Sequence, residues 1–126
     1  MKFLDSLLDL LYPRRCAFCH RLSPDGQPVC GRCAGKLPFT HGSEQKQRLP
    51  GIPACVSPLF YEGDVRRSLL RYKFGGRREY AKIYGEFLTK CIDENGISCD
   101  IITWTPLSRK RLRSRGYDSI SLFYDR

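Results

Sequence analysis

Four cysteines in the first quarter of the chain carry the clearest chemical signal in the sequence. They form two Cys-x-x-Cys pairs, Cys16/Cys19 and Cys30/Cys33, separated by ten residues. Two residues between paired thiols let one turn direct both sulfurs at one metal ion, and two such turns supply four tetrahedral ligands. The spacing therefore predicts a structural Zn²⁺ held by Cys16, Cys19, Cys30 and Cys33. The alternatives are two disulfides, or a redox-active pair beside an unrelated one.

The first thirteen residues predict an amphipathic helix. Apolar residues recur at helical spacing, Asp5 and Asp9 lie on the other side, and Pro13 closes the run. Carboxylates at this spacing interrupt the apolar stretch that a signal peptide needs, and no apolar run is long enough to span a membrane. We therefore expect a cytoplasmic protein without a membrane span. Its first helix is expected to pack on a core or a partner rather than on a membrane surface.

Excess positive charge is the unusual feature of the composition. Twenty-two basic residues against thirteen acidic ones give a formal net charge of +9, which favours a polyanionic partner or a phosphorylated substrate. One basic stretch spans residues 66–82. A second, free of acids, contains Arg109, Lys110, Arg111, Arg113 and Arg115. We interpret the first four of these as candidate contacts to nucleic acid or another anion, and the alternative is a solubilising surface.

Turn signals and periodicity divide the chain into four parts. These are an amphipathic helix over 1–13, a zinc-ribbon module over 14–36, a polar linker over 37–53 and an α/β region over 54–126. The last part predicts strands over 54–61 and 100–104, helices after Asp64 and over 80–92, and a basic loop followed by a helix from Tyr117. This order is typical of a parallel α/β sheet.

The loop after residue 104 is a candidate anion site. Ligands of open α/β sheets collect at the carboxyl ends of strands, where a loop entering a helix offers free N–H groups. Arg115 and Gly116 lie at that predicted junction. Glycine allows close approach of a phosphate, and arginine donates paired hydrogen bonds. The alternative is that Gly116 only makes a turn and the arginines are solvated.

Together these motifs resemble the ComF family. The cysteine pairs, Tyr72-Lys73-Phe74-Gly75, and Pro106-Leu107 leading through Arg109 and Arg111 to Arg115-Gly116-Tyr117-Asp118 occur in its order and spacing, over nearly the whole chain. The resemblance implies a bacterial protein linked to competence for DNA uptake. It implies a zinc ribbon followed by the first part of a type I phosphoribosyltransferase-like α/β domain, with an incomplete parallel sheet. It also implies that Arg115, Gly116 and Tyr117 belong to a pyrophosphate-binding loop.

The sequence departs from the family in two ways. Ser119 follows Asp118 where the family has glutamine, and the chain stops at Arg126 before the acidic strand end and small-residue loop that bind phosphoribosyl pyrophosphate (PRPP). The adjacent pair Asp93-Glu94 ends a predicted helix instead. We therefore expect a truncated or frameshifted product that would bind PRPP only with the missing half. Enzyme activity stays open, and no catalytic residue is assigned.

Two classes of function remain. One is a phosphoribosyltransferase-type protein whose basic loop holds pyrophosphate. The other is a non-enzymatic nucleic-acid- or protein-binding module in DNA uptake, whose basic stretches follow phosphates. Tyr72, Phe74 and Tyr80 could stack on bases, although helical spacing directs Tyr72 and Tyr80 toward the core. The expected partners are single-stranded DNA and competence-machinery proteins such as the family's helicase-like ATPase.

Overall fold

A computed structural model describes residues 10–23 and 26–123. The chain divides into two compact units, Met1–Leu37 and Pro38–Arg126, which we call the N-terminal unit and the C-terminal unit. Most of the helix predicted over 1–13 lies outside the described residues. No helix within them combines the length and apolarity that crossing a bilayer requires.

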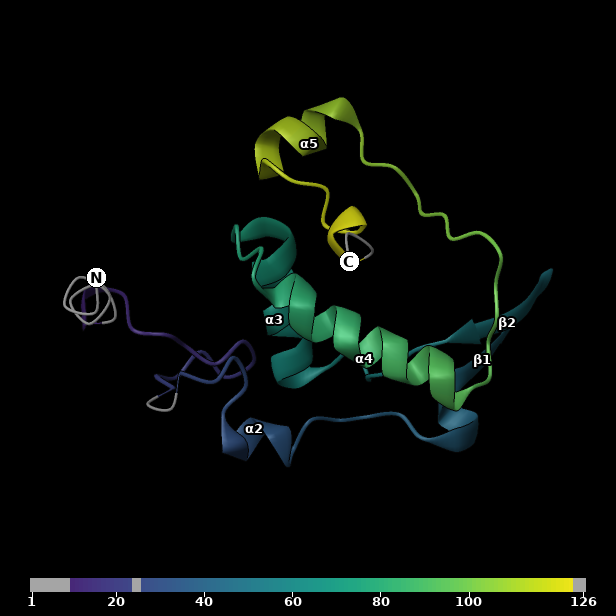
Figure 1. Ribbon diagram of the computed structural model, residues 1–126, viewed down its shortest axis with the longest axis horizontal. Coiled ribbons are helices and arrows are strands. Elements are labelled where there is room, and N and C mark those ends of the chain that lie inside the picture. Colours follow the sequence, from purple (N-terminus) through teal and green to yellow (C-terminus); the bar gives the residue numbers. More distant parts are fainter. Residues whose placement is uncertain (1–9, 24–25, 124–126) are drawn as a thin grey trace. The chain divides into compact units, whose positions relative to one another are not determined.

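The described part of the N-terminal unit consists mainly of turns. Its described residues include the short helix α2 (Gly31–Ala34) (Figure 1). They also include an isolated antiparallel bridge between Arg15 and Leu22. Its buried apolar side chains are Cys16, Ala17, Phe18 and Cys33. Two of these four are cysteines of the predicted zinc site, so among the described residues of this unit the buried apolar side chains gather largely at that site.

The C-terminal unit opens with a β-hairpin where a linker was predicted. Its first elements are the 3₁₀ helix η1 (Gly42–Gln45) and the antiparallel strands β1 (Lys46–Leu49) and β2 (Ile52–Val56). Lys46 pairs with Val56, and Gly51 at φ 75° allows the tight turn. Pro50 and Gly51 therefore mark a hairpin turn within the segment predicted as a linker. This two-stranded antiparallel sheet is the only sheet in the described residues, in contrast to the parallel sheet that was predicted.

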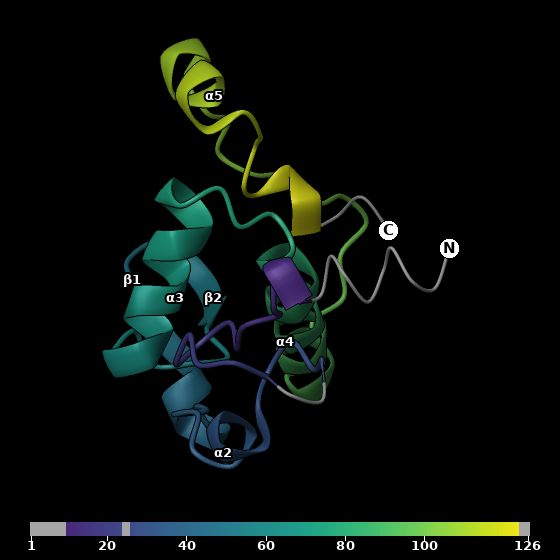
Figure 2. The same cartoon turned by 90° about the vertical axis from the view of Figure 1, so that its left-hand side faces the viewer.

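Two helices follow the hairpin and lie side by side, as Figures 1 and 2 show. They are α3 (Gly63–Phe74) and α4 (Tyr80–Glu94). The apolar stripe predicted for the second helix is confirmed, because Tyr80, Ile83, Tyr84 and Cys91 are all buried. The first helix begins earlier than the predicted start after Asp64, because Glu62 is its N-cap residue and Asp64 lies inside its first turn.

Residues 100–104, predicted as a core strand, form no strand in the structure. Ile101 is 83% exposed and Ile102 is 52% exposed. A strand acquires its hydrogen bonds only from a neighbouring strand, and none of the described residues pairs with this segment. The residue composition of this segment is suited to a strand. A local sequence pattern, however, does not show whether a second strand is available for pairing.

The basic segment predicted as a loop is the helix α5 (Arg109–Arg115). The Ser108 side chain caps it by accepting a hydrogen bond from the Arg111 N–H at 3.3 Å. Gly116 ends it in the left-handed conformation, with φ 74°. The prediction of a helix from Tyr117 is therefore wrong. In the described residues up to 123, the short 3₁₀ helix η2 (Ser121–Phe123) follows instead.

Aromatic side chains form the core of the C-terminal unit. The ring of Tyr72 lies 6.0 Å from that of Tyr84, 6.0 Å from that of Tyr117 and 5.6 Å from that of Phe123. The Tyr72 hydroxyl donates to the Ser119 carbonyl, and the Tyr117 hydroxyl donates to the Tyr72 carbonyl. These contacts hold the segment after α5 against α3.

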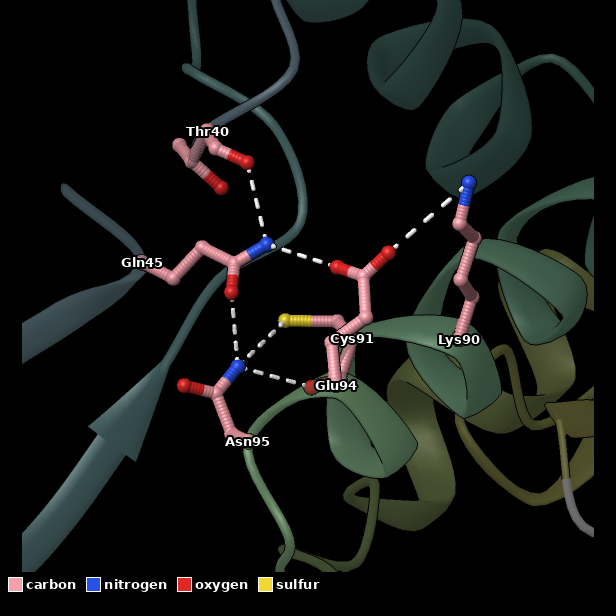
Figure 3. Close-up of polar contacts among 6 residues, drawn as sticks. All are labelled: Thr40, Gln45, Lys90, Cys91, Glu94 and Asn95. Carbon is pink, nitrogen blue, oxygen red and sulfur yellow. Dashed lines mark hydrogen bonds and ion pairs between the residues drawn. The ribbon is translucent and has the colours of Figure 1, made fainter. Parts of the chain in front are cut away.

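A polar network joins the end of η1, directly before the hairpin, to the end of α4 (Figure 3). The buried Gln45 amide donates to the Thr40 carbonyl at 3.0 Å and to the Glu94 carboxylate at 3.1 Å. It also accepts a hydrogen bond from the Asn95 side chain at 2.7 Å. Because a buried amide needs partners for both its donors and its acceptor, this network fixes the hairpin against the helix.

Candidate metal centre

The first Cys-x-x-Cys pair lies on a tight backbone turn. The Cys16 N–H donates to the Arg21 carbonyl at 2.9 Å, and the Ser23 N–H donates to the Arg14 carbonyl at 2.9 Å. His20 closes the turn at φ 61°, and its N–H donates to the Cys16 carbonyl at 3.0 Å. Histidine is one of the residue types that more often adopt this left-handed conformation. The turn brings the two thiols of the pair onto one side.

The second pair lies at the start of helix α2. Cys30 is the N-cap residue and Cys33 belongs to the first turn. The Ala34 N–H donates to the Cys30 carbonyl at 3.0 Å, and the Leu37 N–H donates to the Cys33 carbonyl at 3.0 Å. Because side chains three residues apart lie on the same face of a helix, these two thiols also point in one direction.

All four sulfurs meet at one point. The Sγ atoms of Cys16, Cys19, Cys30 and Cys33 lie within 4.8 Å of one another. A tetrahedron with zinc–sulfur bonds of about 2.3 Å has sulfur–sulfur edges of about 3.8 Å, and the Sγ atoms of Cys19 and Cys30 are 3.8 Å apart. All seven cysteines are free thiols. The site therefore fits a structural Zn²⁺, as the spacing predicts, and the disulfide alternative is wrong.

Hydrogen bonds to sulfur prepare the site for a metal. Burial opposes ionisation of Cys16, but backbone hydrogen bonds from Cys30 and Cys19 outweigh it and lower the pKa of the Cys16 thiol to about 7. The Cys30 N–H lies 3.4 Å from the Cys16 sulfur. Burial, with the neighbouring thiols, raises the pKa of Cys33. Since cysteine binds zinc as the thiolate, metal binding must release the protons that remain.

Within the described residues these four thiols are the only group with metal-binding geometry. Cys55 lies half-buried in β2, Cys91 is buried in α4 and Cys99 is exposed. Four protein ligands complete the coordination of zinc and leave no position for a substrate. The centre is therefore structural and not catalytic.

The predicted anion contacts lie together on α5. Arg109, Lys110, Arg111 and Arg113 are all exposed, and the helix contains no acidic residue. In the part of the chain that the structure describes, none of the four forms an ion pair. Their charges are therefore presented to solvent without internal compensation.

The three candidate pyrophosphate residues lie in a different setting from the one predicted. Gly116 follows the carboxyl end of α5, where the helix dipole is negative. Tyr117 is buried, and Arg115 donates to the Ser119 hydroxyl at 3.1 Å. The Asp118 carboxylate accepts the Ile120 N–H at 3.0 Å. The argument from a helix N-terminus is therefore wrong, although the assignment of these residues to pyrophosphate stays a prediction.

Arg78 has a role that the sequence did not indicate. Its guanidinium donates to the Gly116 carbonyl and lies 5.0 Å from the centre of the Tyr117 ring. Sequence reasoning placed it only in the first basic stretch, because a contact across 38 residues leaves no local pattern. Through this contact the two basic stretches meet in space.

Comparison with known proteins supports the metal centre. Residues 7–45 match the model of the Double zinc ribbon domain family. This segment contains all four cysteines and ends in η1. Neither the curated proteins nor the solved structures gave a match. The close grouping of the four sulfurs and the family match together identify a zinc ribbon with a structural Zn²⁺ at the N-terminus of this chain.

Proposed function

We propose that this chain is a non-enzymatic, ComF-like nucleic-acid-binding protein that handles single-stranded DNA in the cytoplasm. In this proposal the zinc ribbon is a rigid module, and the basic residues of α5 and of the first basic stretch, 66–82, contact phosphates. A zinc ribbon is suited to binding nucleic acid or protein. The link to competence rests on the sequence resemblance described above.

The observation that carries the proposal is the surface of α5. Four exposed basic side chains on one short helix, with no acid among them, form a concentrated positive charge. Such charge attracts polyanions and makes their binding dependent on salt. The Arg78 contact adds the first basic stretch to the same region. A phosphoribosyltransferase role receives less support, because Gly116 lies at the carbonyl end of a helix.

Protein partners enter the proposal through the zinc ribbon. Competence-machinery proteins such as a helicase-like ATPase are the candidates that the resemblance provides. PRPP is a candidate ligand only for a chain that also carries the acidic and small-residue motifs of the phosphoribosyltransferases.

The salt dependence of binding to an oligothymidylate tests the proposal. The affinity is measured over a range of salt concentrations for the unmodified chain and for the variant Arg109→Gln, Lys110→Gln, Arg111→Gln, Arg113→Gln. Glutamine keeps the helix propensity of this segment. For single strands, each basic side chain that neutralises a phosphate adds about 0.7 to the slope of log affinity against log salt. The slope is therefore expected to fall by this amount for each of the substituted side chains that binds a phosphate.

A control variant with the same net charge distinguishes binding at α5 from general electrostatic attraction between the DNA and a basic protein. The variant Arg32→Gln, Lys36→Gln, Lys46→Gln, Arg48→Gln also removes four exposed basic side chains. It is expected to keep most of the slope. Equal decreases in the two variants would contradict a nucleic-acid surface on α5. Weak, salt-insensitive DNA binding combined with tight binding of PRPP would favour the phosphoribosyltransferase alternative.

A further inference from the structure

Phe74 is an exposed aromatic side chain within the first basic stretch, residues 66–82. It is the last residue of α3, and its side chain is 69% exposed. The Gly75 N–H closes the last turn of the helix by donating to the Arg71 carbonyl at 2.7 Å, and Gly76 leaves the helix in the left-handed conformation, at φ 69°. A Cβ atom at Gly75 would lie only 2.7 Å from the same carbonyl oxygen. Glycine at this position therefore permits the close turn that places Phe74 at the helix end.

Arg115 holds one side of the Phe74 ring. Its guanidinium carbon lies 4.9 Å from the ring centre, a cation–π arrangement. The guanidinium is itself fixed by its hydrogen bond to Ser119. An aromatic ring that is supported on one side and largely exposed elsewhere is a surface on which a planar group can stack.

The charges around the ring come from both basic stretches. Lys73 and Arg78 are exposed in the sequence next to Phe74, and Arg115 is contributed by α5. Arg77 is exposed as well, but it forms an ion pair with Glu79 at 3.6 Å. Arg78 links the two segments through the Gly116 carbonyl. Phosphate-binding charge and a stacking surface therefore occur together, which is the combination that single-stranded nucleic acids require.

We propose that Phe74 is a base-stacking site for single-stranded nucleic acid, with Arg115 as the residue that positions its ring. This inference rests on the proposed nucleic-acid function and specifies how the bases are held. Tyr72 and Tyr80, the other aromatic residues of the stretch, are only 1% and 4% exposed and are part of the core. Bases in a duplex are already stacked on one another, so the site selects single strands.

Comparing an oligothymidylate of about 12 nucleotides with an abasic strand of equal length tests stacking apart from charge. Both strands carry the same phosphates, but only one has bases. Stacking contributes about 1–3 kcal/mol per base, so the unmodified chain should bind oligothymidylate roughly 5- to 150-fold more tightly. Phe74→Leu should reduce this preference to less than about twofold and leave the salt slope unchanged. Phe74→Trp should retain it.

Tyr61 provides the matched control, because it is an aromatic residue that is 59% exposed outside the basic stretch. Tyr61→Leu should keep the full preference for bases. Upfield shifts of the Phe74 ring protons on addition of oligothymidylate, absent with the abasic strand, would support direct stacking. A preference that survives in Phe74→Leu would overturn the site. Equal, strongly salt-dependent affinity of the unmodified chain for both strands would overturn stacking but leave the proposed function intact, whereas salt-insensitive affinity for both would overturn the two together.

Discussion

The two units of this chain bury different kinds of side chain. Apart from its two buried cysteine ligands, the N-terminal unit buries only Ala17 and Phe18 among its described apolar residues. The C-terminal unit buries a set of large apolar and aromatic side chains, which includes Val65, Tyr72, Tyr80, Ile83, Tyr84 and Tyr117. The first unit is therefore organised by a metal centre and the second by aromatic packing.

This difference shows how a short segment can become ordered without a core. Segments below about 40 residues bury too little surface to fold alone and usually need metals or disulfides. The four thiols of the N-terminal unit supply that constraint. The C-terminal unit is long enough to use burial, and it adds hydrogen bonds from tyrosine hydroxyls to backbone carbonyls.

The largest expected effect is the loss of zinc in Cys30→Ser. Zinc binding contributes about 10–16 kcal/mol to folding in small zinc modules, so this variant should lose its metal and unfold the N-terminal unit. Metal analysis of the purified protein measures the zinc content of the variant and of the unmodified chain, for which the four-cysteine cluster predicts one bound zinc. Cys99→Ser, an exposed cysteine outside the cluster, is the control. Full zinc occupancy in Cys30→Ser would disprove the ligand set.

The next largest effect is expected for Tyr72→Ala. This side chain is 1% exposed and contacts three aromatic rings. Deleting a buried aromatic side chain costs about 3–5 kcal/mol, which urea unfolding followed by circular dichroism can measure. Tyr61→Ala removes an exposed ring and should change the free energy of unfolding by less than about 0.5 kcal/mol. If Tyr72→Ala and Tyr61→Ala lower the urea midpoint of unfolding equally, the aromatic cluster does not stabilise the C-terminal unit.

A smaller effect is expected for Asn95→Ala at the end of α4. The Asn95 side chain donates to Gln45 at 2.7 Å and to the Cys91 carbonyl at 2.8 Å (Figure 3). Its removal leaves the buried Gln45 oxygen without this donor, at a cost of about 1–3 kcal/mol. Lys90→Ala breaks only an exposed 3.8 Å ion pair with Glu94, worth about 0.5 kcal/mol or less. If both variants unfold at the same urea concentration, the network does not fix the hairpin.

The smallest effect is expected just above pH 10. Burial, partly offset by the hydrogen bond to Ser68, raises the pKa of Tyr84 to about 12, whereas an unfolded tyrosine ionises near pH 10. The unfolded chain therefore loses this proton first as the pH rises. The tyrosine contribution to stability is complete below about pH 10 and falls towards pH 12.

Urea unfolding at several pH values between 8 and 11 measures this loss of stability at alkaline pH. Burial also raises the pKa of Tyr72 and Tyr117, so Tyr84→Phe should reduce the pH dependence without abolishing it. A stability that is independent of pH over this range would contradict the burial of these hydroxyls.

Local sequence patterns predicted the parts of the fold that depend on local geometry. The zinc ligands follow from the spacing of Cys16, Cys19, Cys30 and Cys33, and α4 follows from its apolar period. The signals for α5 are also local, namely Ser108 as the cap and Gly116 as the stop. The expected order of strand, loop and helix favoured a loop in that position instead.

Features that depend on distant partners could not be predicted from local patterns. Gln45 is buried by contacts to Glu94 and Asn95, about 50 residues away. Residues 100–104 have the composition of a strand, but pairing needs a neighbour that the described chain lacks. The stacking of Arg115 on Phe74 likewise joins two segments that are separated in the sequence. In each case the outcome depends on a contact with a distant segment, which only the structure reveals.

Hydrogen exchange on the full chain, with and without a zinc chelator, tests the contrast between the two units most directly. Chelation should remove protection from amides such as Ala34 and Leu37, whose hydrogen bonds surround the zinc ligands. Amides in the centre of α4 should keep their protection, because aromatic packing holds that helix. Loss of protection in both units on chelation, or none in either, would contradict the account that zinc organises one unit and aromatic packing the other.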